Sequence, residues 1–114
     1  MCASFKSLVI ATFAVVLLFG TSSHAKDVFK GSDFLEWPEN SQKTFMDAAI
    51  LMAGGIAAIN TDQQGQCIYN WYFNDRIESI RNKIRKTMTE HSKHPPSGVI
   101  IAMAQKECGS MRYK

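Results

Sequence analysis

The sequence predicts an all-α protein, a small four-helix bundle with one disulfide bond. Three observations point to this fold class. Apolar residues recur every three or four positions, which is typical of helices and not of strands. Prolines at positions 38, 95 and 96 divide the chain into segments of helical length. Once a predicted leader is removed, the two cysteines that remain are Cys67 and Cys108.

Residues 1–25 have the pattern of a secretory signal peptide. Lys6 precedes an unbroken apolar run of 12 residues that begins at Leu8. Ser23 and Ala25 fit the small-x-small cleavage pattern, which places the cut before Lys26. We therefore expect a single domain over residues 26–114, located in the periplasm. The apolar run is shorter than the roughly 20 residues of a membrane span, and retention as an N-terminal anchor is the alternative.

The composition is that of an ordinary globular domain. Hydrophobic residues make up 46% and charged residues 20% of the 114 residues, which is neither disordered nor collagen-like. The formal net charge is +3, and it becomes 12 − 10 = +2 when Lys6 leaves with the leader. Nucleic-acid-binding domains are usually much more basic. We therefore expect no nucleic-acid partner, and no stable membrane insertion after cleavage.

The first half of the domain predicts one short helix and one long helix. Ser32 is suited to cap a short helix that ends before Pro38. Asn40 or Ser41 is suited to cap a second helix that extends to about Asn60. This helix is apolar on nearly all sides, so we expect it to be central. Its predicted inner face repeats with helical spacing and consists of Phe45, Ala49, Met52, Ile56 and Ile59.

The Ala53-Gly54-Gly55 segment predicts close packing inside the second helix. Each glycine costs about 1 kcal/mol relative to alanine in a helix interior. Such a cost indicates that another backbone approaches at this point. The alternative, a loop that binds phosphate, has no support because neither glycine-rich phosphate motif is present in the sequence.

The second half of the domain predicts two more helices. A polar loop over residues 61–66 precedes a third helix from about Ile68 to His91, which Asn74-Asp75 could divide. The fourth helix runs from about Pro96 or Ser97 to Glu107. The expected inner faces are Phe73, Ile77, Ile80, Ile84 and Met88 in the third helix, and Val99, Ile100, Met103 and Ala104 in the fourth.

The two remaining cysteines predict a disulfide between Cys67 and Cys108. Two cysteines in an exported domain are expected to pair, and with only two there is a single way to do so. Closing a loop of this length stabilises a fold by about 4 kcal/mol in the chain-entropy model. An antiparallel pair formed by the third and fourth helices would bring the two cysteines together.

The sequence offers little support for a catalytic site or a metal site. His91 and His94 could supply half of a metal site, but no further ligand follows at a recognisable spacing. Asp33 and Glu36 resemble a carboxylate pair, although two solvated surface groups explain them better. No nucleophile motif such as G-x-S-x-G is present. We expect no catalytic residue, no bound metal and no cofactor.

Two segments predict contact with a protein partner. The first is basic and could meet an acidic partner, although a solvated helix face is the usual explanation of such a segment; it contains Arg76, Arg81, Lys83, Arg85 and Lys86. The second combines the polar loop with the aromatic cluster after it, because aromatic residues are enriched at interface hot spots. The candidate contact residues are Asp62, Gln63, Gln64, Tyr69 and Tyr72. A homodimer is compatible with the same features.

The order of these features resembles the Rap1a/Tai family of small exported helical proteins. The likeness begins with Phe29, Gly31 and Asp33-Phe34-Leu35 and continues through a Met-Ala-Gly-Gly-Ile segment at residues 52–56. It ends with a His-x-x-His-Pro-Pro region and a last helix that closes on Cys108. The resemblance implies a periplasmic immunity protein that binds and neutralises a cell-wall amidase effector of type VI secretion.

A second likeness is to acid-stress chaperones of the HdeA type. These are also small, exported, helical and joined by one disulfide, and they open at low pH to expose apolar surface. In that family a cysteine precedes the Asp-Phe-Leu segment, and none does here between the predicted leader and that segment. The resemblance implies the alternative function, a periplasmic holdase that binds unfolded clients. Both likenesses imply a protein that binds other proteins without catalysis.

Overall fold

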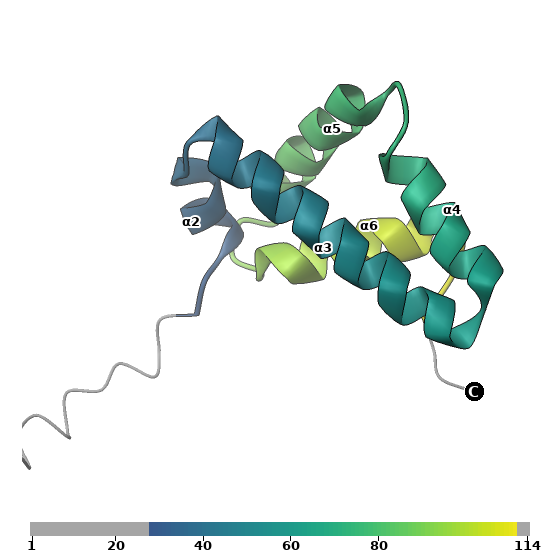
Figure 1. Ribbon diagram of the computed structural model, residues 1–114. Coiled ribbons are helices and arrows are strands. Elements are labelled where there is room, and N and C mark those ends of the chain that lie inside the picture. Colours follow the sequence, from purple (N-terminus) through teal and green to yellow (C-terminus); the bar gives the residue numbers. More distant parts are fainter. Residues whose placement is uncertain (1–27, 112–114) are drawn as a thin grey trace, which may run out of the picture.

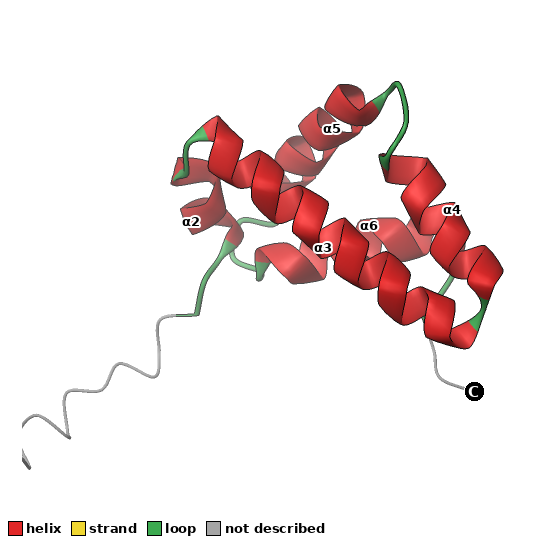
Figure 2. Ribbon diagram, viewed as in Figure 1, coloured by secondary structure: helices red, strands yellow, loops and turns green. Residues whose placement is uncertain are grey.

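The computed structural model describes residues 28–111, and within this range helices joined by loops and turns are the only regular structure, without strands (Figures 1 and 2). The predicted signal peptide lies outside the described residues. None of the described helices is both long and apolar enough to span a bilayer. The helices, in chain order, are α2 (Gly31–Glu36), α3 (Glu39–Asn60), α4 (Asp62–Tyr72), α5 (Ile77–Glu90) and α6 (Pro96–Cys108).

The long helix α3 is the element around which the others are arranged. Helix α4 turns back along the C-terminal half of α3, and α6 crosses behind α3 (Figure 1). Helix α5 packs against α6 and, at its other side, against the short helix α2. The all-α class is therefore confirmed, but the described residues form five helices rather than the predicted four.

The fifth helix arises because the third predicted helix is divided at residues 73–76. Asn74 ends α4: its side-chain amide donates to the carbonyls of Asn70 (2.7 Å) and Trp71 (2.9 Å). Its side-chain oxygen accepts from the backbone N–H of Arg76 at 2.7 Å. Asparagine competes with helical hydrogen bonding in this way. The predicted break at Asn74-Asp75 is therefore real and is caused by the first of the two residues.

The start of α4 is a second departure from the sequence prediction. Residues 62–66 were predicted to form a polar loop, but they make the first turns of α4. Thr61 caps this helix, because its hydroxyl oxygen accepts from the backbone N–H of Gln64 at 3.2 Å. Capping and helix formation satisfy backbone groups that a loop would leave to water, so polar composition alone misled the prediction.

Both N-terminal helices begin earlier than predicted. Helix α2 starts at Gly31, not after Ser32, and the carboxylate of Asp33 accepts from the backbone N–H of Lys30 at 3.0 Å. Helix α3 starts at Glu39, directly after Pro38, so neither Asn40 nor Ser41 is its cap. Proline fixes φ near the helical value, which lets a helix begin immediately after it.

The predicted inner face of α3 is wrong. Met52, Ile56 and Ile59 are exposed, while Phe45 and Ala49 are only half-buried. The opposite side of the helix is buried instead, with larger side chains in its first half and small ones near its contact with α4. Its members are Gln42, Met46, Ile50, Ala53, Gly54 and Ala57.

The core is formed where this buried side of α3 meets α4, α5 and α6. The predicted inner faces of the later helices are largely confirmed, because Ile84, Met88, Val99, Ile100 and Ala104 are all buried. Phe73 is an exception and lies exposed at the C-terminal end of α4. The remaining core side chains are Phe34, Met46, Ile50, Ala57, Ile68 and Tyr72.

Close packing of α3 against α4 explains the glycines. A Cβ atom on Gly54 would lie 2.2 Å from Cε1 of Tyr69. A Cβ atom on Gly65 would lie 2.8 Å from Cβ of Ala58 and 2.9 Å from the carbonyl oxygen of Gly54. These distances are far below ordinary contact, so side chains at these positions would force the helices apart. The predicted close approach is confirmed at Gly54, where the Tyr69 ring and the Gly65 position of α4 lie against α3, but not at Gly55, which is exposed.

A cluster of polar side chains around the buried Tyr72 and Arg81 joins α3, α4 and α5. The Tyr72 hydroxyl donates to the carboxylate of Asp47 at 2.5 Å. Arg81 is buried, donates to the Tyr72 oxygen at 3.1 Å, and pairs with Asp47 at 2.8 Å and with Glu78. The basic segment is therefore not wholly a solvated face, because one of its members lies in the core. A buried guanidinium needs such partners to offset its lost hydration.

The pKa values of both Tyr72 and Arg81 are raised within the cluster. Burial, followed by the hydrogen bond to Asp47, raises the pKa of Tyr72 well above its ordinary value. Burial lowers the pKa of Arg81, but the hydrogen bonds to Asp47 and Tyr72 outweigh it and raise that pKa overall. Tyr72 therefore stays neutral and Arg81 stays charged throughout the physiological range.

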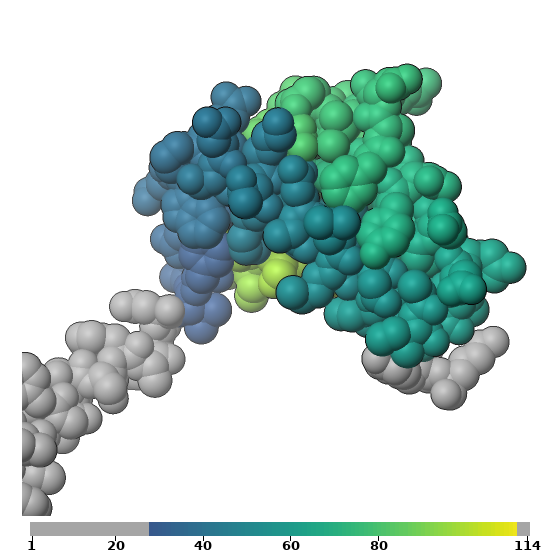
Figure 3. All heavy atoms as spheres, in the orientation of Figure 1, coloured from purple at the N-terminus to yellow at the C-terminus, as the bar shows by residue number. Residues whose placement is uncertain are grey.

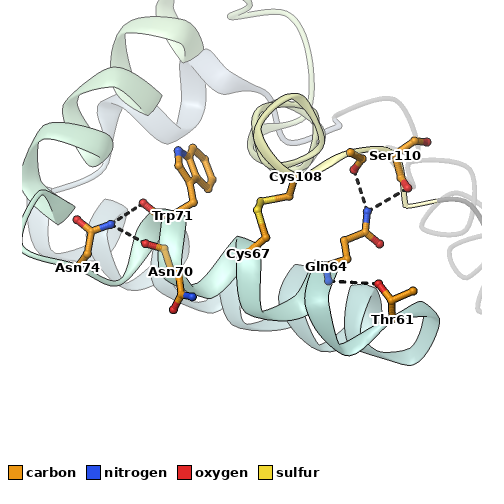
Figure 4. The surroundings of a disulfide bond; sticks show 9 residues. Thr61, Gln64, Cys67, Asn70, Trp71, Asn74, Cys108 and Ser110 are labelled. Atoms are coloured by element: carbon orange, nitrogen blue, oxygen red, sulfur yellow. Dashed lines mark hydrogen bonds between the residues drawn. A yellow bond between two sulfur atoms is a disulfide. The ribbon is translucent and has the colours of Figure 1, made fainter.

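The predicted pairing of Cys67 with Cys108 is confirmed at the level of geometry. Their sulfur atoms are 2.02 Å apart and their Cα atoms 5.8 Å apart (Figure 4). One turn before Cys67, the Gln64 amide donates to the carbonyls of Gly109 at 2.9 Å and Ser110 at 3.0 Å. The bridge and these hydrogen bonds attach the end of α6 to α4.

Candidate protein-binding surface

An apolar strip runs along the solvent side of α3. Its four large side chains, Leu51, Met52, Ile56 and Ile59, have exposed fractions between 40% and 71%. At roughly 100° per residue these positions fall on one side of a helix. No Lys, Arg, Asp or Glu occurs between residues 48 and 61. We call these four side chains, together with Gly55 between them, the outer face of α3.

The outer face is a true surface and not the margin of the core. It lies opposite the side of α3 that contains Ile50, Ala53 and Ala57, which are buried. The space-filling view shows α3 side chains at the front of the molecule, with no other described element covering them (Figure 3). Contiguous exposed apolar surface of this kind marks an interaction site in many soluble proteins.

Tyr69 extends the outer face from α3 onto α4. Its ring lies over Gly54, and its hydroxyl donates to the carbonyl of Leu51 at 3.2 Å. A Cβ atom on Gly55 would lie 3.8 Å from the hydroxyl oxygen. Tyr69 is half-buried, so part of the ring remains accessible beside the strip. Among the predicted contact residues, it is the one that borders the exposed apolar side chains.

The other predicted contact residues have different positions. Asp62 and Gln63 are exposed in the first turn of α4, close in sequence to Ile59 at the end of the outer face. Gln64 is half-buried and its amide is occupied by the C-terminal segment. Tyr72 is completely buried in the polar cluster, so it is not accessible to a partner in this conformation.

The histidine pair and the carboxylate pair considered above both lie at the surface of the described chain. The rings of His91 and His94 are 5.8 Å apart at the surface. Within residues 28–111 no three or more histidine, cysteine or acidic side chains gather in a way that could hold a metal ion. Asp33 is engaged at the start of α2, as a partner of the Lys30 backbone.

Sequence reasoning missed the outer face because it assigned most of these residues to the core. Leu51 was not singled out at all. A signal was nevertheless present, because residues 48–59 are apolar around the whole helix, more than one packed face needs.

No protein-family model, no curated protein and no solved structure matches this chain. What can be said of its function therefore depends on the residues and their arrangement.

Proposed function

We propose that this chain is an exported, non-catalytic protein-binding module whose principal contact surface is the outer face of α3. The observation that carries the proposal is the uncharged strip of Leu51, Met52, Ile56 and Ile59, exposed on a helix that also forms the core. Removing such side chains from water contributes about 25 cal/mol for each Å² buried. Covering the strip with a protein partner would therefore be favourable.

The rigidity of α3 supports the same proposal. Its buried side packs against α4 and α6, and α4 is joined to α6 by the Cys67–Cys108 pair. A binding surface on a fixed helix loses little conformational freedom on association. Tyr69 is held beside the strip by its hydrogen bond to Leu51, which preorganises an aromatic ring of the type enriched in interfaces.

The specific form we propose is an immunity-type inhibitor. In this form the module acts in the periplasm and neutralises a secreted cell-wall amidase by occupying it. The order of sequence features that resembles the Rap1a/Tai family supports this form. A partner enzyme that is bound through an apolar helix face needs no catalytic residue on the inhibitor.

The test combines identification of the partner with a surface variant. The chain is used to capture proteins from a periplasmic extract, and the captured partner is titrated against wild type, Met52→Glu and Ser79→Glu. We expect Met52→Glu to weaken binding at least tenfold, because it places a charge in a desolvated interface. Ser79→Glu adds the same charge at an exposed position of α5 and is expected to bind normally.

The outcomes separate the forms of the proposal. A captured amidase whose activity falls on binding supports the immunity form. A second copy of this chain, seen as a dimer by light scattering and dissociated by Met52→Glu, would replace that form with self-association. Equal binding by both variants, with unchanged helical circular dichroism, would contradict the assignment of the surface.

One observation favours the alternative function, an acid-responsive holdase. The buried Arg81 guanidinium is held by ion pairs with two carboxylates, Asp47 and Glu78. Loss of both partners would leave the guanidinium buried without compensation, which would favour opening of the core. Fluorescence of an apolar dye at pH 2–3 tests this function. Retained helicity without dye binding would contradict it.

A further inference from the structure

A groove with a volume of about 590 Å³ lies between α5 and α6, with Trp71 of α4 at one end. This volume is within the range of ligand sites in proteins. The groove shares no residue with the outer face of α3, so the two surfaces can be occupied independently. Trp71 follows Cys67 by one turn and points to the same side of α4 (Figure 4).

The groove has an apolar floor and one wall of very small residues. Val99 and Met103 contribute to its floor, and Val99 is buried. Gly98 and Ala102 are exposed along α6, four residues apart. No atom lies within 4 Å of the place where a Cβ on Gly98 would stand. Packing within the described chain therefore does not occupy this wall, and another backbone could approach it closely.

The charges of the groove are separated between its two ends. Helices α5 and α6 are consecutive and connected by a short turn, so the start of α5 lies near the end of α6. Lys83 therefore lies near Lys106 and Glu107, beside Trp71, whereas Glu90 lies at the turn with His91 and His94. These two lysines and two glutamates are not engaged elsewhere, because among the described residues Lys83, Lys106, Glu90 and Glu107 make no ion pair.

We propose that this groove binds an amphipathic helical segment of a partner protein. Apolar side chains of the segment pack on Val99 and Met103, and its backbone approaches Gly98 and Ala102. An acidic residue of the segment lies at the lysine end, where the net charge is 2 − 1 = +1, and a basic residue lies near Glu90. A helix in a groove between two helices is a common mode of peptide recognition.

The spacing of the charges defines the segment further. Lys83 and Glu90 are seven residues apart on α5, which corresponds to about 10.5 Å at 1.5 Å per residue. On a bound helix that lies along the groove, residues i and i+7 have the same separation and face the same way. The expected partner segment therefore has its acidic and basic residues seven positions apart, with apolar residues between them.

Synthetic peptides test the proposal directly. The probe is a 14-residue amphipathic peptide with leucines at helical spacing and with Glu and Lys seven positions apart. Two comparison peptides carry Lys at both positions or Glu at both. The variant Trp37→Phe leaves Trp71 as the one tryptophan, since the chain has 2, so its fluorescence reports the groove. Calorimetric titration of the unsubstituted chain keeps the test independent of that variant.

We expect the Glu/Lys peptide to bind at least tenfold more tightly than either comparison peptide. Lys83→Glu makes the charge of the lysine end 1 − 2 = −1, so this variant is expected to prefer the Lys/Lys peptide. Ala102→Arg fills the small wall and is expected to abolish binding of all three. Met52→Glu alters only the outer face of α3 and is expected to change none of these affinities.

Three results would overturn the proposal. The first is equal binding of the three peptides, and the second is no measurable binding of any of them. The third is binding of dodecanoate but not of the peptides, which would assign the groove to a small amphiphile. Because Met52→Glu and Lys83→Glu act on separate surfaces, failure here would leave the proposal for α3 untouched.

Discussion

The two sides of the molecule are held together in different ways. On the α3–α4–α6 side, helices are in close contact through Gly54 and Gly65, and the Cys67–Cys108 pair adds a covalent link. On the α2–α5 side, polar side chains make most of the specific connections. The buried amide of Gln42 is an example, because it donates to the carbonyls of Leu35 (3.2 Å) and Trp37 (3.0 Å).

The polar side depends on groups that lie far apart in the sequence. The Gln42 side-chain oxygen accepts from Arg85 at 2.8 Å, which ties α3 to α5. The backbone N–H groups of Gly31 and Ser32 donate to the turn before α6 at 2.9 and 3.0 Å. Helix α2 has only 6 residues and is too short to be stable alone, so these bonds and its aromatic contacts keep it in place.

This difference between the two sides determines how firmly each proposed binding surface is held. The outer face of α3 belongs to the covalently linked side, whereas the groove lies between α5 of the polar side and α6 of the linked side. A substitution that weakens the α3–α4–α6 side should therefore disturb both the outer face and the groove. A substitution that weakens the α2–α5 side should disturb the groove first.

Of the substitutions that test this comparison, removal of the disulfide is expected to lower the stability of the fold most. The double variant Cys67→Ser, Cys108→Ser removes the constraint on a loop with a sequence separation of 41. In the chain-entropy model it should lower the free energy of unfolding by about 4 kcal/mol. Urea denaturation followed by circular dichroism measures this change.

The control is wild-type protein under reducing conditions, which should lose a similar amount of stability. Protein purified under non-reducing conditions with both thiols free to react would contradict the expected bond. A loss below about 1 kcal/mol would show that packing, not the covalent link, dominates the α3–α4–α6 side.

The next largest effect is expected from Gly65→Ala. The new Cβ would stand 2.8 Å from Ala58 and 2.9 Å from the Gly54 carbonyl, and both belong to a packed helix that cannot yield easily. Overpacking of this kind costs about 1–3 kcal/mol, more than alanine adds to helix propensity. We expect a lower midpoint in thermal unfolding. An unchanged or higher midpoint would show that α3 and α4 are less closely packed than described.

The positions of the helices along the chain could be predicted from the sequence better than which side of each helix is buried. Prolines and spacing placed the long segments correctly, and the pairing of Cys67 with Cys108 followed from their being the last two cysteines. The burial of α3 could not be predicted from periodicity, because large apolar side chains lie on both sides of the helix: Ile50 is buried, whereas Leu51 and Met52 are exposed. Where α3 meets α4, the short distance between the helices selects Ala53, Gly54 and Ala57 for the interior.

Contacts between distant residues were also beyond sequence reasoning. Tyr72 was predicted to be a candidate contact residue because aromatic residues are enriched at interfaces. The structure instead buries Tyr72 beside Asp47 and Arg81, which come from two other helices. Nothing local in the chain indicates that these three side chains meet, since they are brought together only by the packing of α3, α4 and α5.

The polar cluster gives a smaller, pH-dependent prediction. The pKa of Tyr72 is raised in the folded protein above its ordinary value of 10.0. Its contribution to stability is therefore complete below pH 10 and is lost as the pH rises above it. The slope is at most about 1.4 kcal/mol per pH unit for one proton. We expect Tyr72→Phe to be about 1 kcal/mol less stable at pH 8, with the difference from wild type shrinking by pH 11.

Urea denaturation at pH 8, 10 and 11 measures this difference, and Tyr69→Phe is the control because it lies outside the cluster. If Tyr72→Phe and Tyr69→Phe follow wild type in parallel over this range, the cluster does not hold the Tyr72 proton, and the α4–α5 connection is weaker than the contacts indicate.

Gly98→Ala makes the same chemical change as Gly65→Ala on a surface that faces no other described element. No atom lies within 4 Å of the new Cβ, so the substitution meets no clash. Alanine favours a helix over glycine by about 0.5–1 kcal/mol, so the midpoint of thermal unfolding should rise slightly. The same methyl group narrows the small wall of the groove, and we expect the Glu/Lys peptide to bind several-fold more weakly. A variant that is more stable but binds the peptide less tightly would show that Gly98 serves binding and not the packing of the core. Unchanged binding would show that the peptide does not need to approach α6 closely.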